Sequence, residues 1–203
     1  MWVIKLGGSL AGSAELQSWL DVIARTPGPP RVLVPGGGPF ADAVRAAQAR
    51  WRFNERVAHR MALLAMHQYG LMLAALKPKL QPAETVEAIH AECAAQHVPV
   101  WQPYAMVAKG PEIEASWDVT SDSLALWLAS TLGAERLILV KSAALPREPE
   151  KIGSLVEKGI LDRGFPRYAR AFAGAIFCMQ RGEHAALGRA LARGEPAGTR
   201  VLV

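Results

Sequence analysis

Cysteine and histidine are both scarce in this chain, which has two cysteines and five histidines among its 203 residues. Cys93 and Cys178 belong to no CxxC or Cys/His pattern, so a disulfide framework and a structural zinc site are excluded, and we interpret both as buried, reduced thiols. No two histidines are spaced four apart with a glutamate between them, which excludes a zinc enzyme of that type. We therefore expect no metal site built from protein side chains alone.

Long apolar runs are also missing, and none reaches the roughly 18 residues that a bilayer requires. The N-terminus lacks a basic leader with a small-residue cleavage site, so we expect a cytoplasmic protein that is neither secreted nor held in a membrane. Lysine and arginine exceed aspartate and glutamate by 23 to 18, but no dense basic block or aromatic RNA-binding signature accompanies them. This excess favours a small anionic ligand over nucleic acid.

One nucleotide-binding motif is absent, because nothing matches G-x-x-x-x-G-K-[ST], and a P-loop kinase is thereby excluded. Two other glycine stretches are present, "MWVIKLGGS" at 1–9 and "RVLVPGGGPFAD" at 31–42. Each is a short apolar run followed by adjacent glycines and then by the start of a helix. Glycines leave backbone N–H groups open to an anion, and a following helix adds its positive end. Each stretch therefore predicts a cradle for an anion such as phosphate.

Strands and helices alternate along the chain, which favours an α/β fold with a mainly parallel sheet. The length favours one domain, residues 1–203. In such sheets ligands bind beyond the carboxyl ends of the strands, where both glycine stretches lie. We expect strands at 2–6, 31–34, 98–101, 137–140, 175–178 and 199–203, and helices at 13–25, from about 39, and at 54–76, 85–96, 119–132 and 183–192.

The first stretch places Lys5 two residues before Gly7 and Gly8, within reach of an anion that those glycines hold. In phosphoryl transfer such a lysine offsets the charge on the moving group. A tight turn with a solvent-exposed lysine is the alternative. The second stretch, 36–41, fits the relaxed dinucleotide fingerprint with Glu55 downstream, but it follows the second strand instead of the first, which disfavours a nicotinamide cofactor.

An acidic segment, "SWDVTSDSLALWLAS" at 116–130, carries Asp118 and Asp122 at the start of a predicted helix. Simple capping is one reading, because carboxylates are favoured there by the helix dipole. The other is that Asp122 orients the site lysines, that Asp118 lies one helical turn away, and that the hydroxyls of Thr120 and Ser121 bind a ligand. Mg²⁺ would then arrive with ATP, since a few carboxylates and nucleotide phosphates suffice to hold it.

Three stretches in this order, "VIKLGGSL", "VLVPGGGPFAD" and "DVTSDSLA", resemble the amino acid kinase family, as do "LILVKS" and the closing "GTRVLV". This family includes acetylglutamate, aspartate, uridylate and isopentenyl phosphate kinases. The resemblance implies a three-layer αβα sandwich, assembly into a homodimer or larger homo-oligomer, and transfer of the γ-phosphoryl group of Mg-ATP to a small anionic acceptor.

The resemblance also implies roles for individual residues. Lys5 and Asp122 are then catalytic, the first stabilising the transferring group and the second organising the lysines. The expected ATP-phosphate contacts are Gly7, Gly8, Ser9 and Lys141, and the expected acceptor contacts are Gly36, Gly37, Gly38, His59, Asp118 and Thr120. The chain departs from the family where "LVKSAALP" replaces Asp-Val-Asp-Gly and where a second catalytic lysine has no clear match. Lys141, Lys158, Arg163 and Arg167 remain candidates for that second cation.

Residues 58–70, "AHRMALLAMHQYG", are similar to the branch that phosphorylates [5-(aminomethyl)furan-3-yl]methyl phosphate in the biosynthesis of methanofuran and methylofuran. The product of that branch is a diphosphate, so each glycine stretch would hold one phosphate-bearing molecule. His59 would contact the acceptor phosphate, although a surface or core histidine is the alternative. We expect Val57, Met61, Leu64 and Tyr69 to face the core. Uridylate, isopentenyl phosphate, a carboxylate acceptor and a non-catalytic nucleotide- or oxyanion-binding protein remain open.

Overall fold

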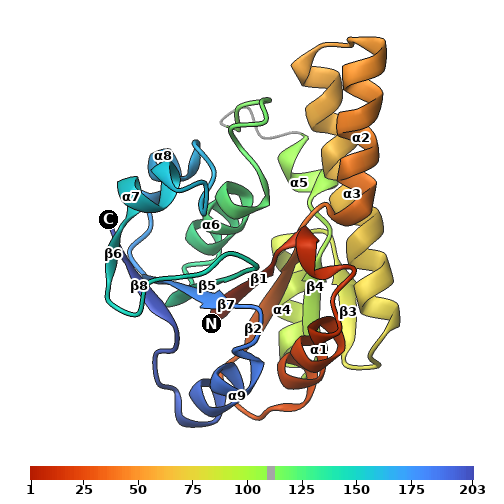
Figure 1. Ribbon diagram of the computed structural model, residues 1–203. Helices are drawn as coiled ribbons and strands as arrows, with labels where there is room; N and C mark the ends of the chain where they lie inside the picture. Colours follow the sequence, from red (N-terminus) through yellow and green to blue (C-terminus); the bar gives the residue numbers. More distant parts are fainter. Residues whose placement is uncertain (109–112) are drawn as a thin grey trace.

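The computed structural model describes residues 1–108 and 113–203 (Figure 1). Its strands form one sheet in the order β3-β4-β2-β1-β5-β7-β8-β6, and the pairings are parallel except for β7 with β8. The expected α/β fold is confirmed. The strands are β1 (Trp2–Leu6), β2 (Arg31–Pro35), β3 (Leu80–Ala83), β4 (Val98–Trp101), β5 (Arg136–Lys141), β6 (Glu150–Lys151), β7 (Ala175–Gln180) and β8 (Thr199–Leu202).

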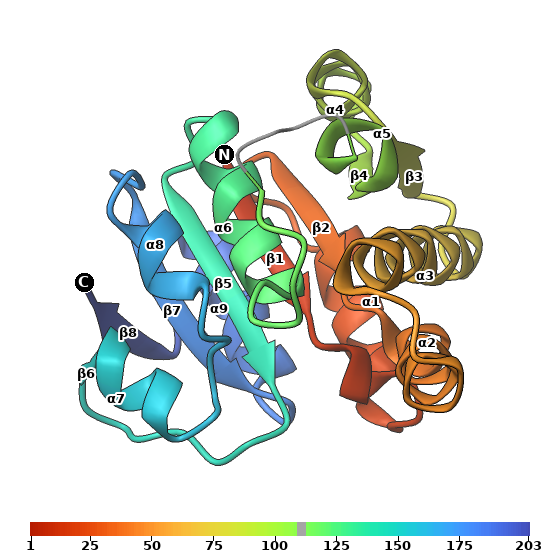
Figure 2. The ribbon, with the colours of Figure 1, turned by 90° about the horizontal axis from the view of Figure 1, so that it is seen from above.

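Helices cover both faces of this sheet, as the view from above shows (Figure 2). Helices α1 and α9 lie on one face, and α6 lies on the other with α7 and α8 beside it. The helices are η1 (Gly8–Leu10), α1 (Glu15–Arg25), α2 (Gly38–Trp51), α3 (Glu55–Ala75), α4 (Val86–Ala94), α5 (Tyr104–Val107), α6 (Ser121–Thr131), α7 (Ile152–Glu157), α8 (Phe165–Ala169) and α9 (His184–Arg193).

The central strands are buried on both faces, which explains why they are nearly continuous apolar runs. In β1, Val3 packs into the layer that includes α6, whereas Trp2, Ile4 and Leu6 pack into the layer that includes α1 and α9. The same alternation runs along β5, because successive side chains of a strand point to opposite faces. Two apolar layers around one sheet give the three-layer sandwich.

A helical hairpin of α2 and α3 projects beyond the strand tips on one side of the molecule (Figure 1). Asn54 begins α3 as its cap, since its side chain accepts a hydrogen bond from the backbone N–H of Val57. The predicted apolar stripe was partly wrong, because Val57 is 41% and Leu64 44% exposed, whereas Tyr69 is fully buried. Ala58 and Ala65 are buried instead, and Ala65 packs against Ala41 and Val44 of α2.

Several short elements were missed from the sequence, namely β3, β6, α5, α7 and α8. Each has six residues or fewer, and β3 carries Pro82, which is tolerated because β3 is an edge strand. The last strand, β8, pairs antiparallel with β7 and parallel with β6. Among the helices that the structure describes, none is both long and apolar enough to cross a membrane.

Candidate active site

The two glycine stretches contact each other at the carboxyl ends of neighbouring strands. β1 and β2 are parallel and pair Leu6 with Pro35, and the N–H of Gly36 donates to the carbonyl of Leu6 at 2.9 Å. A Cβ on Gly36 would lie 2.4 Å from the nitrogen of Gly8, and a Cβ on Gly8 would lie 2.5 Å from the nitrogen of Gly38. The two corners therefore fit together only because side chains are missing, and they face the same site, as predicted.

Lys5 and Lys141 meet on one carboxylate, Asp122. The Nζ of Lys5 lies 2.9 Å from Oδ1 of Asp122, and Lys141 forms an ion pair with Oδ2. The strands explain this convergence. Lys5 shares a face of β1 with Val3, and Lys141 shares a face of β5 with Leu139, so both lysines point toward α6, whose first turn carries Asp122. The ammonium group of Lys5 also lies beside Gly7, where a Cβ would be 3.7 Å from Nζ.

This cluster is withdrawn from water, and burial controls its charge. Lys5 is 5% and Asp122 is 4% exposed. Burial alone would raise the pKa of Asp122, but the two ammonium groups hold it at about 2. Burial lowers the pKa of Lys5, and the Asp122 carboxylate offsets part of that effect. The site therefore holds an ionised carboxylate between two lysines, an arrangement that favours an incoming anion.

The other candidates for the second cation are engaged elsewhere on the surface. Lys158 pairs with Glu150 at 3.0 Å, Arg163 approaches Asp118 at 3.9 Å, and Arg167 pairs with Glu114 at 3.2 Å. All three side chains are more than half exposed. Of the four candidates for the second cation, Lys141 is thus the one that the structure brings to Asp122. This lysine lies at the end of β5 and not on a following helix.

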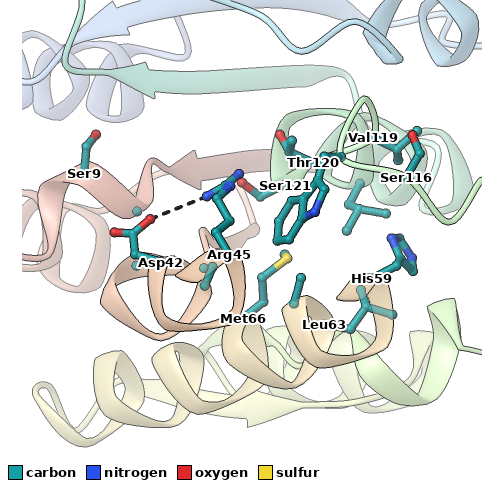
Figure 3. A pocket seen from close by; sticks show the side chains of 17 residues that line it. Ser9, Asp42, Arg45, His59, Leu63, Met66, Ser116, Val119, Thr120 and Ser121 are labelled. Carbon is teal, nitrogen blue, oxygen red and sulfur yellow. Dashed lines mark hydrogen bonds and ion pairs between the residues drawn. The ribbon is translucent and has the colours of Figure 1, made fainter. Parts of the chain in front are cut away.

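A cavity of about 330 Å³ adjoins the glycine corners, between the α2–α3 hairpin and residues 116–121 (Figure 3). Gly8, Gly37 and Gly38 line one end. His59 lines its wall from α3, and Thr120 lines it from the start of α6. The remaining wall is mixed in character and includes Arg45, Leu63, Met66, Ser116, Trp117 and Ser121. Burial lowers the pKa of His59, so its imidazole is neutral near pH 7.

Trp117 and Arg45 are site residues for which sequence reasoning gave little or no role. The guanidinium of Arg45 lies 4.3 Å from the ring centroid of Trp117, and the indole N–H donates to the side-chain oxygen of Gln48 at 2.6 Å. Arg45 also reaches Asp42 at 3.5 Å (Figure 3). An arginine stacked on an aromatic ring is oriented for an anion or a flat ligand. The signal available was the tryptophan within the acidic segment, directly before Asp118.

Two predicted contacts are exposed. Asp118 does not line the cavity and faces Arg163. The expectation that it sits one helical turn from Asp122 is wrong, because α6 begins only at Ser121. Ser9 lines the same cavity as Gly8, and its hydroxyl lies 2.7 Å from that of Ser142, the residue after Lys141.

The hydroxyl of Thr120 has a partner that the sequence did not reveal. It donates to Asp162 at 2.7 Å, although Thr120 also lines the cavity. Over residues 1–108 and 113–203 no three His, Cys, Asp or Glu side chains gather as a metal-binding group.

Comparisons with known proteins identify the family and the fold. The model of the amino acid kinase family matches residues 1–144. A curated relative, [5-(aminomethyl)furan-3-yl]methyl phosphate kinase from Methanocaldococcus jannaschii, is 27% identical over 140 residues, which cover 68% of this chain. The matched part spans 64% of that relative's length.

Solved structures share the whole fold at low identity. Uridylate kinase from Archaeoglobus fulgidus has a TM-score of 0.71 at 17% identity and covers 99% of both chains. UMP kinase from Bacillus anthracis has a TM-score of 0.68 at 16% identity, and the match covers 98% of this chain and 94% of the UMP kinase chain. An isopentenyl phosphate kinase has a TM-score of 0.63 at 18% identity, and the match covers 98% of this chain and 99% of the isopentenyl phosphate kinase chain. The sheet is that of the amino acid kinase fold, and the chain belongs to the amino acid kinase family.

Proposed function

We propose that this protein is an ATP-dependent kinase that phosphorylates a phosphate monoester to give a diphosphate. The observation that carries the proposal is the lysine pair on Asp122 beside two interlocked glycine corners, with a cavity opening from the second corner. The proposed acceptor is [5-(aminomethyl)furan-3-yl]methyl phosphate, after the relative from M. jannaschii, in the biosynthesis of a methanofuran-type coenzyme.

In the proposed reaction an oxygen of the acceptor phosphate attacks the γ-phosphorus of ATP. The bond from that phosphorus to its bridging oxygen breaks, and ADP leaves with the electron pair. A phosphate monoester is largely ionised at neutral pH, since its second pKa is about 6, so the nucleophile needs no general base. A reaction that needs no general base agrees with a site that offers cations and backbone N–H groups.

The residues supply position and positive charge. We assign Gly7, Gly8 and Lys141 to the ATP phosphates and Lys5 to the transferring group, because its ammonium lies beside the first glycine corner. A dry cluster strengthens each of these electrostatic contacts. Both oxygens of Asp122 face lysines, so we propose that Mg²⁺ comes bound to the phosphates of ATP, whose charge it partly neutralises.

The cavity supports a small acceptor. Its volume of about 330 Å³ is at the lower end of the range for small-molecule sites. We assign Gly36 to Gly38 and His59 to the acceptor phosphate, with Trp117 and Met66 as apolar contacts for a flat ring. A neutral imidazole can donate one N–H to a phosphate oxygen.

The test is ADP release with a panel of acceptors. Purified protein with ATP and Mg²⁺ is given the aminomethyl-furan phosphate, uridylate, isopentenyl phosphate or a carboxylate such as acetylglutamate. We expect turnover with the furan phosphate and a diphosphate product detected by mass spectrometry. Turnover only with uridylate or isopentenyl phosphate would keep the reaction type and replace the acceptor. Binding of ATP without transfer to any member would refute the kinase and favour a nucleotide-binding protein.

We also propose a homo-oligomer working in the cytoplasm, where ATP is abundant and the thiol of buried Cys178 stays reduced. Support for self-association comes from α3, where the exposed apolar residues Val57, Leu64 and Leu71 recur every seven positions along one side. Two copies of this helix, antiparallel about Leu64, would set Val57 against Leu71. Sedimentation of the wild type and of Leu64→Glu tests this, and a wild-type monomer would refute it.

A further inference from the structure

Asp162, in the segment between α7 and α8, is a carboxylate to which the proposed reaction gives no role. It accepts a cluster of hydrogen bonds from the start of α6. The backbone N–H of Thr120 donates at 2.9 Å and its hydroxyl at 2.7 Å. The backbone N–H of Ser123 donates at 3.1 Å, and the hydroxyl of Ser123 donates to the other oxygen. One side chain from about forty residues away thus binds two residues of the first turn of α6.

This arrangement replaces the ordinary cap of the helix. Thr120 stands at the N-cap of α6, where its hydroxyl would normally accept the N–H of the residue three positions on, Ser123. No such bond forms. Asp162 accepts that N–H instead, and the hydroxyl of Thr120 donates to the same carboxylate. The helix is therefore fixed to a distant segment and not capped by its own sequence.

Gly164 adds to this attachment. Its N–H donates to the carbonyl of Asp118 at 2.7 Å. A Cβ at Gly164 would lie 2.8 Å from the side chain of Val119 and 2.9 Å from the carbonyl oxygen of Asp118. The Asp162–Gly164 segment consequently fits closely against the two residues that precede the N-cap of α6.

Asp122 lies between the two residues that Asp162 holds. We propose that Asp162 is a positioning residue for phosphoryl transfer: by fixing Thr120 and Ser123 it orients Asp122 toward both Lys5 and Lys141. The inference rests on the proposed function for its kinetic readout. The inference extends that function, because the segment after α7 then determines how Lys5 and Lys141 are arranged around Asp122.

The charges support a role beyond capping. Burial raises the pKa of Asp162, and the nearby Asp122 raises it further. Holding these two carboxylates close together therefore costs free energy. The charged groups that face Lys5 are Asp122 from α6, Lys141 from β5 and Asp162, and the thiol of Cys178 lies near from β7. Of these, Asp122 and Asp162 raise the pKa of Lys5 against the effect of burial. Asp162 thus also helps to keep Lys5 protonated.

The experiment compares Asp162→Asn with Glu157→Gln, which removes an exposed carboxylate at the end of α7. Asparagine keeps the shape but loses the charge and one acceptor oxygen. We expect Asp162→Asn to lower kcat by about 10- to 100-fold, with each KM within about threefold of wild type, because a small displacement of a catalytic group has such effects. Glu157→Gln should match the wild type.

A second readout needs no turnover. The ¹³Cε resonance of Lys5 is titrated in the ligand-free protein, and Asp162→Asn should move the pKa of Lys5 downward while Glu157→Gln leaves it unchanged. Wild-type kcat in Asp162→Asn would overturn the proposal, as would a lower kcat with an unchanged pKa of Lys5. Should no acceptor be phosphorylated at all, the proposed function fails, and the titration still decides whether Asp162 controls the cluster.

If Asp162→Asn does not fold, Ser123→Ala serves instead, because it keeps the carboxylate and removes one of its donors. We expect a kcat several-fold below wild type with an unchanged KM for ATP, since the first turn of α6 loses part of its attachment. A wild-type kcat in Ser123→Ala would count against positioning through this contact.

Discussion

The backbone nitrogen of Gly8 lies in the space that a side chain on Gly36 would need, 2.4 Å from the position of its Cβ. The two glycines follow neighbouring strands, β1 and β2, which end at the same edge of the sheet. The two corners therefore pack directly against each other, and this close approach requires glycine at both positions.

The first prediction concerns this contact. Gly36→Ala should push the first glycine corner away, raise the KM for ATP as well as for the acceptor, and lower the free energy of unfolding by about 1–3 kcal/mol, the usual cost of overpacking. Steady-state kinetics and denaturant unfolding measure both effects. Gly12→Ala is the matched control, since nothing lies within 4 Å of a Cβ there. Normal kinetics in Gly36→Ala would show that the corners can separate freely.

The lysine pair gives the second prediction. Lys5→Ala and Lys141→Ala should each lower kcat by about 10²–10³, the typical effect of removing one donor to a developing charge. Lys79→Ala serves as the control, because that exposed lysine donates to the carbonyl of Gln96 at 3.0 Å and has no assigned role. A Lys5→Ala protein that turns over normally would contradict its assignment, and normal turnover in Lys141→Ala would return the second cation to the other candidates.

Asp122 gives the third prediction, which concerns stability. Asp122→Asn leaves two buried ammonium groups without their carboxylate, and we expect a loss of about 3–5 kcal/mol in the free energy of unfolding. In the wild type the pKa of Asp122 is about 2 in the folded chain against an ordinary value of 3.8. A depressed pKa stabilises the fold above the ordinary value, so this contribution should be complete above pH 3.8 and disappear as the pH falls through about 2.

Urea unfolding of both proteins across this acid range measures the effect. The difference between wild type and Asp122→Asn should shrink as the pH falls, because protonation removes the carboxylate charge from the wild type too. A difference that stays constant with pH would mean that the ion pairs do not carry the stability.

His59 gives the fourth prediction. His59→Ala should raise the KM for the acceptor by about tenfold, because that change corresponds to the binding free energy of one hydrogen bond to a charged group. The KM for ATP should stay unchanged. His67→Ala, eight positions further along α3, is the control because His67 does not line the cavity. Equal acceptor kinetics in the two variants would end the assignment of His59 to the acceptor phosphate.

The long elements and the glycine corners could be predicted from the sequence because their signals are local. A buried parallel strand such as β1 is a short apolar run, and adjacent glycines mark its end whatever the rest of the chain does. Within α1, Leu16, Leu20 and Ile23 recur at helical spacing and are buried.

The missed features depend on contacts between distant segments. Lys141 could not be matched to Asp122 from spacing alone, because their meeting depends on which strand lies beside β1. Asp162 gave no sign of its bonds to residues about forty positions earlier. On α3, the predicted apolar stripe included Val57 and Leu64, which are exposed, whereas the smaller Ala65 is buried against α2.

The proposed acceptor cavity takes one wall from the α2–α3 hairpin, whereas the lysine pair and its carboxylate come from β1, β5 and α6. The hairpin projects beyond the strand tips (Figure 1). Side chains on α2 and α3 can therefore be exchanged without altering Lys5, Lys141 or Asp122, so under the proposed function the choice of acceptor can be engineered apart from phosphoryl transfer.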